Sequence, residues 1–274
     1  MRYQKTVVGI VAPLTLFSYV SCQLDGQMGN QMFQIATTVA YALDHQCECS
    51  FPHLKEALNG QLNHQYVFHR LNIDPFPPDA PFHLYSQHEH ALYNEYAPIP
   101  FDGRNLCLQG YFQNEKYFSH HSAVIRQLFA PAEKILTTID SMYGDILKKP
   151  TVAVHVRTYF PEKISPDIGG IQEGNMSYYI EALAHFSDDF TFLVFSDCPE
   201  WTRTHFPRIR SRIEFIERNP HYIDFYLMSS CHHQIVSPRS SFSWWAAWLN
   251  PNPNKIVIAP SYGAYPMSWI RTNL

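Results

Sequence analysis

The fold class is decided by one stretch of sequence, Thr151-Val152-Ala153-Val154-His155-Val156-Arg157. It is an apolar run of strand length with two polar residues near its end. Strands and helices then alternate along the rest of this half, with strands expected at 190–196, 234–237 and 255–259 and helices at 177–186, 222–230 and 242–249. Such alternation predicts an α/β fold with a parallel sheet covered by helices on both faces.

The first half of the 274-residue chain carries a smaller unit of the same kind. We expect a strand over 19–24, a turn over 25–29 and an amphipathic helix from Asn30 onward. Six prolines between positions 75 and 100 predict loops and short helices there, before a strand and turn over 106–112. Two α/β units facing a central cleft are therefore predicted, with domains at 1–148 and 149–274.

The net charge and the cysteine pattern argue against nucleic-acid binding and against a zinc site. A net charge of −4 gives no general basic surface for nucleic acid. We interpret the arginines between positions 203 and 218 as a solvated segment, with binding to an anionic lipid or glycan surface as the alternative. Cys47 and Cys49 have a poor spacing for zinc, and no second Cys or His pair stands at the spacing of a zinc finger. The cluster Cys231-His232-His233 does not by itself indicate a metal site, so we expect mostly buried thiols in a reducing compartment and no metal.

The end of the 151–157 strand is the first candidate site. Strand alternation places His155 and Arg157 on one face, near the carboxyl end where open parallel sheets bind ligands. The planar fork of Arg157 suits a phosphate, although a structural ion pair would also account for it. Asp197 ends the next strand and could either accept two N–H bonds from a guanine edge or cap a helix.

Two further motifs are suited to an anion. The turn Gly26-Gln27-Met28-Gly29-Asn30-Gln31 could present backbone N–H groups at a helix start, or could be a tight turn capped by Asn30. Ser240, Ser241 and Phe242 open the helix that carries Trp245 and Trp248. The serines suit an anion, Phe242 could stack on a base or pack inside, and the tryptophans are expected in the core. Without a Walker motif or an Asp-x-Asp pair, these signals predict a nucleotide ligand held without metal.

Several blocks in this order resemble glycosyltransferase family 11, the α-1,2-fucosyltransferases. The resemblance runs from Tyr19 to about Pro260 and is carried by Gly29-Asn30-Gln31-Met32-Phe33-Gln34, Gly110-Tyr111-Phe112-Gln113-Asn114-Glu115-Lys116-Tyr117-Phe118, His155-Val156-Arg157, Phe195-Ser196-Asp197 with Trp201, and Leu227-Met228-Ser229 through Trp248-Leu249. It implies a GT-B-like fold of two Rossmann-like domains, no cofactor and no metal. It also implies inverting transfer from GDP-β-L-fucose to the 2-hydroxyl of a terminal β-galactose in a glycan.

The resemblance also implies residue roles. Arg157 would hold the diphosphate and stabilise the departing GDP, with support from His155. Gly29 and Asn30 would lie near the phosphates, and Asp197 would read the guanine. The remaining pocket residues would be Ser240, Ser241 and Phe242.

The arginine motif departs from the family pattern. Relatives usually continue with a second arginine, a glycine and an aspartate, whereas here Arg157 is followed by Thr158, Tyr159 and Phe160. A catalytically weak GDP-sugar-binding protein is therefore one alternative, and a transferase using another GDP-sugar or a protein acceptor is another. For a catalytic base we favour Asp167 over two neighbouring acids, unless all three are merely solvated and no strong base exists.

The N-terminus has the charged start and apolar middle of a signal peptide, with Arg2 and Lys5 before an apolar stretch over 7–17. That stretch is too short to span a bilayer. Cleavage near Cys22 would delete the strand over 19–24, which matches the family's first strand. We therefore expect an unprocessed cytoplasmic protein, with peripheral membrane association as an option.

Overall fold

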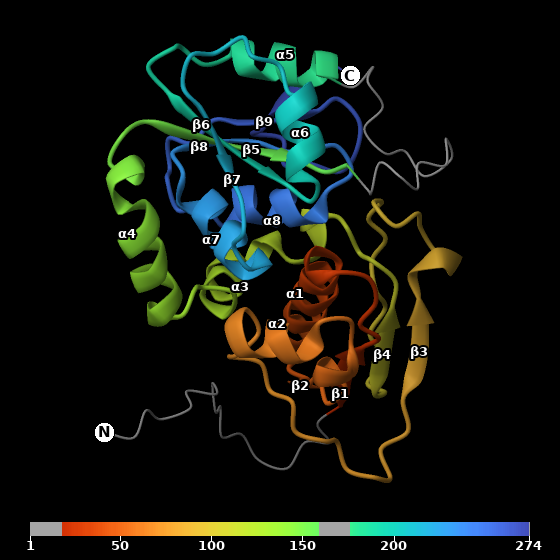
Figure 1. Cartoon of the computed structure of the whole chain (residues 1–274). Coiled ribbons are helices and arrows are strands. Elements are labelled where there is room, and N and C mark those ends of the chain that lie inside the picture. Colours follow the sequence, from red (N-terminus) through yellow and green to blue (C-terminus); the bar gives the residue numbers. More distant parts are fainter. Residues whose placement is uncertain (1–17, 159–175, 274) are drawn as a thin grey trace.

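The computed structural model describes residues 18–158 and 176–273, which form two parallel sheets (Figure 1). The first sheet has the order β2-β1-β4-β3, with β1 Tyr19–Cys22, β2 Glu48–Cys49, β3 His83–Ser86 and β4 Leu106–Gln109. The second has the order β10-β9-β8-β5-β6-β7, with β5 Thr151–Val156, β6 Thr191–Ser196, β7 Ile213–Ile216, β8 His233–Ile235, β9 Val257–Pro260 and β10 Ile270–Thr272. The predicted α/β class is confirmed.

Helices follow the strands in both halves. The first half contains α1 Met28–His45, η1 Leu54–Glu56, α2 Gly60–Tyr66, η2 Gln87–Glu89, η3 Glu115–Tyr117, η4 Ser119–His121, α3 Ser122–Leu128 and α4 Glu133–Leu147. The second half contains α5 Met176–Ala184, α6 Pro199–His205, α7 His221–Ser230 and α8 Ser241–Leu249. In Figure 1, α5 lies above the second sheet, α6 lies in front of its strands, and α7 and α8 lie between that sheet and α1.

Alternation along β5 explains this layering. Val152, Val154 and Val156 belong to the core cluster that contains Tyr178 and Tyr179 of α5. Ala153 belongs to the other cluster, which contains α7 and α8 residues. The second sheet is therefore covered on both faces, as predicted. His155 shares the face of Ala153 and so points toward α8 and the first half of the chain.

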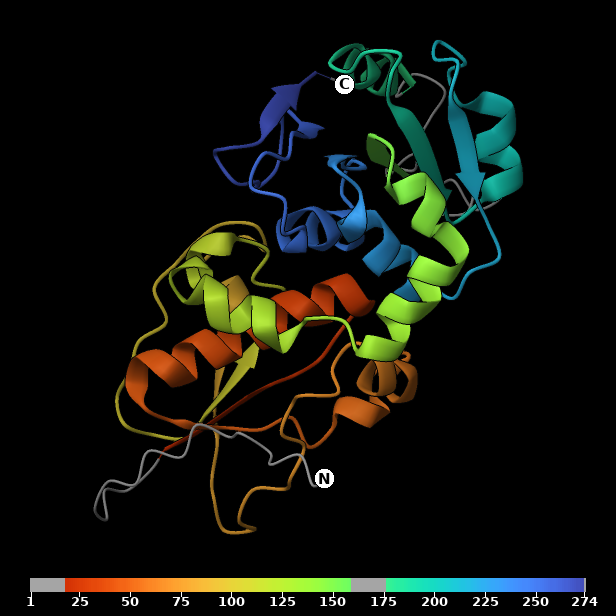
Figure 2. The same cartoon turned by 90° about the vertical axis from the view of Figure 1, so that its left-hand side faces the viewer.

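Helix α8 joins the two halves. The fully buried Trp245 ring lies 5.0 Å from the ring of Phe33, 5.1 Å from Phe118 and 5.4 Å from Phe129, measured between centroids. The tryptophans are thus core residues, as predicted. Helix α4 runs along the side of the molecule from one half to the other and contacts α7 (Figure 2). The domain boundary at 148 and 149 stays a prediction.

Four of the five arginines between positions 203 and 218 are exposed, which agrees with the interpretation of a solvated segment, and several of them have partners. Arg210 forms an ion pair with Asp188 at 3.1 Å, and Arg203 pairs with Glu217. The guanidinium groups of Arg203 and Arg208 lie over the Phe215 ring of the edge strand β7. Within residues 18–158 and 176–273, no helix has both the length and the apolar character that crossing a membrane requires.

Candidate active site

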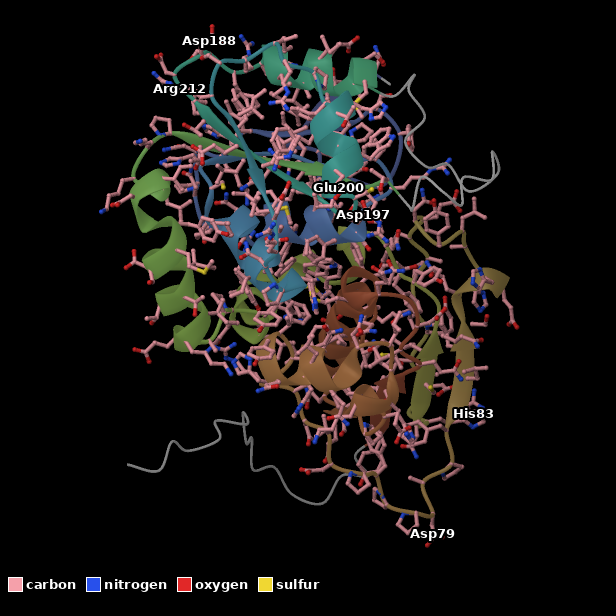
Figure 3. All side chains as sticks on the ribbon, in the orientation of Figure 1. Asp79, His83, Asp188, Asp197, Glu200 and Arg212 are labelled. Atoms are coloured by element: carbon pink, nitrogen blue, oxygen red, sulfur yellow. The ribbon has the colours of Figure 1, made fainter. Side chains whose placement is uncertain are left out.

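Arg157 follows β5 directly, and two contacts hold it in place. Its backbone N–H donates to Ser237 Oγ at 2.9 Å, and its guanidinium Nη1 lies 3.2 Å from Asp197 Oδ2. The side chains of Arg157 and Asp197 are 19% and 13% exposed, so the pair is sheltered yet reachable from solvent. Figure 3 places Asp197 between the upper and lower halves of the molecule, near the lower end of α6. A sheltered, oriented guanidinium is suited to binding a phosphate.

Thr158 occupies the position after the arginine and binds the same carboxylate. Its backbone N–H and its Oγ1 donate to Asp197 Oδ1 at 2.7 and 3.0 Å. Both oxygens of Asp197 therefore contact Arg157 or Thr158, and Asp197 orients the arginine rather than capping α6. Its predicted contact with guanine stays a prediction.

His155 lies behind Arg157 and is almost fully buried. Its Nδ1 is 3.2 Å from Ser240 Oγ. Burial lowers the pKa of His155 to about 4, with Arg157 lowering it further and Asp197 opposing the change. The imidazole is therefore neutral at pH 7, and it supports the site through hydrogen bonds rather than as a second cation.

The buried imidazole predicts a pH dependence of stability. Below about pH 6.5 the unfolded chain takes up a proton at His155 that the folded chain accepts only near pH 4. The contribution of His155 to the free energy of unfolding is therefore fully present above pH 6.5. It is lost as pH falls toward 4, a change of about 3 kcal/mol. Chemical denaturation of wild type and His155→Asn between pH 4 and 7.5 measures it. Burial raises the pKa of Asp224 to about 7, which changes the free energy of unfolding with pH in the opposite direction. Asp224 is present in both proteins, so its effect cancels when their free energies of unfolding are subtracted. A pH-independent difference would contradict the assignment.

Two residues that the sequence analysis did not identify hold this end of the sheet. Tyr179 of α5 donates its hydroxyl to the His155 carbonyl at 2.9 Å and lies 3.1 Å from Ser237 Oγ. Ser237 in turn accepts the Arg157 N–H. The sequence showed Tyr179 only as part of an apolar stripe, because its partners lie 24 and 58 positions away.

The start of α8 is built by serine hydroxyls. Ser240 is the N-cap and accepts from the Ser243 N–H at 3.3 Å, while Ser243 Oγ accepts from the Ser237 N–H at 3.2 Å. Phe242 is partly buried, with its ring 5.6 Å from the His155 ring and 5.3 Å from the Phe225 ring. The predicted helix start is confirmed, and these hydroxyls hold it beside His155.

Gly29 lies in a helix and not in the predicted turn. It lies in the first turn of α1, which begins at Met28 and not at Asn30; the turn itself is at Gly26, with φ +72°. A Cβ on Gly29 would lie 2.6 Å from the carbonyl carbon of Ser241 and 2.7 Å from the Phe242 nitrogen. Gly29 is therefore required for close contact between the starts of α1 and α8. A phosphate contact at Gly29 stays a prediction.

Asn30 completes that contact. Its Oδ1 accepts from Ser241 Oγ at 2.7 Å and from Gln113 Nε2 at 2.9 Å. These bonds link the first half of the chain to α8 at the position where the sequence analysis expected phosphates. Asn30 and Ser241 are therefore brought together as predicted, while their contact with a ligand stays a prediction.

The tight approach at Gly29 predicts a large effect of one methyl group. Gly29→Ala should lower the free energy of unfolding by about 1–3 kcal/mol, because the methyl would meet backbone atoms of Ser241 and Phe242 as well as Ser241 Oγ. Gly144→Ala is the matched control: this glycine is also helical, and a Cβ there meets only the flexible Asp140 side chain. Urea denaturation compares the two. Equal effects would contradict the assigned contact.

Arg239 was also missed by the sequence analysis. It is exposed, directly precedes the Ser240 N-cap and has a left-handed φ of +56°, which is uncommon for arginine. It lines a small cavity of about 70 Å³ together with Gln113, Ser241 and Tyr262. Its position next to the serine motif was the signal that could have identified it.

A larger cavity of about 510 Å³, lined by Leu24, Phe51 and Phe82 among others, contains none of the predicted site residues.

The remaining predictions concern a base and the thiols. Asp167 lies outside the described residues, so its role stays a prediction. Cys231 is buried as expected, whereas the other five cysteines are only partly buried. Burial raises the pKa of Cys22 and of Cys231 to about 12. All six cysteines are free.

The site residues from Gly29 to Phe242 fall within one family match. The model of Glycosyl transferase family 11 matches residues 16–268. The chain belongs to this family. The protein is therefore a glycosyltransferase, and the family resemblance of the sequence motifs is confirmed.

Characterised relatives are similar over most of this chain. An alpha-1,2-colitosyltransferase of Escherichia coli is 29% identical, over 93% of this chain and 99% of the relative. A galactoside alpha-(1,2)-fucosyltransferase 1 of Ateles belzebuth is 27% identical, over 82% of this chain and 63% of the relative. This chain thus spans less than two thirds of the second relative.

Solved structures support the fold. The fucosyltransferase NodZ from Bradyrhizobium gives a TM-score of 0.59 at 14% identity, over 91% of this chain and 97% of that one. An Arabidopsis thaliana FUT1 mutant in complex with GDP gives 0.54 at 13% identity, over 91% and 72%. The predicted GT-B-like architecture is confirmed.

Proposed function

We propose that this family 11 glycosyltransferase moves L-fucose from GDP-β-L-fucose to the 2-hydroxyl of a terminal β-galactoside, with inversion at the anomeric carbon. The observation that carries the proposal is Arg157, a sheltered guanidinium at the carboxyl end of β5 that Asp197 and Ser237 hold in place. Open parallel sheets bind ligands at this end. A relative named as a galactoside alpha-(1,2)-fucosyltransferase supports the acceptor, and a similar fold soaked with GDP-fucose supports the donor.

Catalysis in this proposal rests on stabilising the leaving group. As the bond between fucose and GDP breaks, negative charge develops on the β-phosphate, and Arg157 neutralises it through charge-assisted hydrogen bonds. The acceptor hydroxyl attacks from the opposite face of the sugar, which converts the β-linked donor into an α-fucoside. Its proton goes to a base such as Asp167 or, late in the reaction, to a phosphate oxygen.

Arg239 supplies the second positive charge in this proposal. The family's second arginine is replaced here by Thr158, whose hydroxyl binds Asp197. Arg239 instead lies at the N-terminal end of α8, where the helix dipole also favours an anion. A left-handed arginine beside a helix start is the kind of local strain that functional sites retain.

The reaction should not require a metal ion. In the proposed site Arg157, Arg239 and the start of α8 take the role that a divalent cation has in other transferases. We therefore expect fucose transfer in excess EDTA at the same rate as in buffer, within about twofold. The rate is measured from released GDP. Loss of transfer in chelator, with recovery on adding manganese or magnesium, would contradict the prediction.

A colitosyl donor is the second candidate, because the named colitosyltransferase aligns with almost the whole of both chains. A donor screen decides between them: GDP-fucose, GDP-colitose, GDP-mannose and UDP-galactose are each offered with a β-galactoside. We expect the highest kcat/KM with GDP-fucose. A preference for GDP-colitose would establish the second candidate. GDP binding without turnover of any donor would indicate a catalytically weak binding protein.

A further inference from the structure

A separate cluster of metal-binding side-chain types lies at the C-terminal end of α1. Asp44 belongs to the last turn of this helix, and His120 and His121 belong to η4. Asp44 Oδ1 is 2.7 Å from His121 Nε2 and 3.1 Å from His120 Nε2. At a rise of about 1.5 Å per residue, Asp44 lies about 21 Å along α1 from Asn30, so the cluster is remote from the proposed donor site.

The geometry is close to that of a bound transition metal. The three potential ligand atoms all lie within 4.8 Å of one another. Tetrahedral bonds of about 2.0–2.1 Å would place the ligand atoms about 3.3 Å apart, so the hydrogen-bonded pairs need to open by only a few tenths of an ångström. The side chains of Asp44, His120 and His121 are 38%, 46% and 27% exposed, which leaves room for this adjustment and for entry of an ion.

We propose that Asp44, His120 and His121 form a binding site for a divalent transition-metal ion, with zinc as the representative. Two imidazole nitrogens and one carboxylate oxygen suit zinc, cobalt or nickel, whereas magnesium and calcium prefer oxygen ligands. The C-terminal end of an 18-residue helix adds favourable electrostatics for a cation. Water completes the coordination.

The bound ion would have a structural effect. It would join the end of α1 to η4, which leads directly into α3. The opposite end of α1 carries Asn30, which contacts Ser241 of α8. An ion at this site therefore stabilises the packing of α1 without taking part in the transfer reaction.

The test uses the full chain, freed of metal with chelator and then dialysed. Calorimetric titration with zinc chloride should give one equivalent, and the melting temperature should rise with zinc concentration but not with magnesium. His120→Ala, His121→Ala and Asp44→Asn should each weaken zinc binding more than tenfold, because even outer-shell changes cost about 10- to 100-fold. His53→Ala is the matched control. His53 also contacts a carboxylate, that of Glu56, but this exposed pair has only one imidazole and should not bind zinc.

Cobalt distinguishes this site from the cysteines. Cobalt bound by nitrogen and oxygen should give weak visible bands without a thiolate charge-transfer band, and the visible bands should be lost in His120→Ala. The metal-free melting temperature of each variant establishes that it folds. The proposal is overturned if wild type shows no saturable zinc binding, if Asp44→Asn binds as tightly as wild type, or if a thiolate band persists in the variants.

Discussion

Arg157→Ala is expected to lower kcat by roughly 30- to 1,000-fold, because losing a charge-assisted contact to the departing phosphate costs about 2–4 kcal/mol. GDP affinity should fall as well, since the same guanidinium holds the bound diphosphate. Stopped-flow or quenched single-turnover transfer, measured beside GDP titration, separates the two effects.

Arg157→Lys is the informative control. It keeps the charge but loses the planar fork that bonds Asp197 and a phosphate together, so it should recover little of the lost rate. Thermal unfolding of both variants should show that the fold is retained. Wild-type kinetics in either variant would remove Arg157 from the proposed mechanism.

Asp197→Asn should lower kcat by up to about 100-fold, because Arg157 loses its charge partner and moves from its bonding position. Thr158 can still donate to the remaining side-chain oxygen, so the backbone near the site should hold. If Asp197 acts by orienting Arg157, inhibition by GDP and by IDP should weaken by the same factor.

The ratio of GDP to IDP inhibition tests the other role. IDP lacks the amino group of guanine, which would donate a hydrogen bond to a carboxylate that recognises the base. A hydrogen bond to a charged group contributes about 1.5–3 kcal/mol. Loss of a preference for GDP over IDP in Asp197→Asn, with kcat unchanged, would show that Asp197 reads the base and does not orient the arginine.

Much of the second half could be predicted from local pattern. The apolar run of β5 and the serine-capped aromatic helix α8 are strong signals, and both elements lie where expected. β3 was missed because it is four residues long and follows a proline-rich segment. β7 was missed because it is a short edge strand with exposed Glu214 between apolar residues.

The site was predictable in its residue types but not in its contacts. Arg157, His155 and Ser240 do come together, but no local pattern indicates that Thr158 donates to Asp197 or that Tyr179 binds the end of β5. Such contacts join residues that are 24 to 39 positions apart, and their geometry depends on the packed fold.

Gly29 shows the same limit at longer range. A glycine in a glycine-rich motif suggested a phosphate turn, whereas its missing Cβ is required by a neighbour 212 positions away in Ser241. Nothing local to residues 26–31 specifies that helix contact.

The most direct test of the proposed activity is the linkage of the product. The full chain is incubated with GDP-fucose and lactose, and the purified trisaccharide is examined by NMR with one- and two-dimensional through-bond and through-space spectra. We expect an α-anomeric fucose attached to O2 of the galactose, formed in stoichiometric amount with released GDP. A β-anomer, attachment at another galactose oxygen, or no transfer to any galactoside in a wider acceptor panel would contradict it.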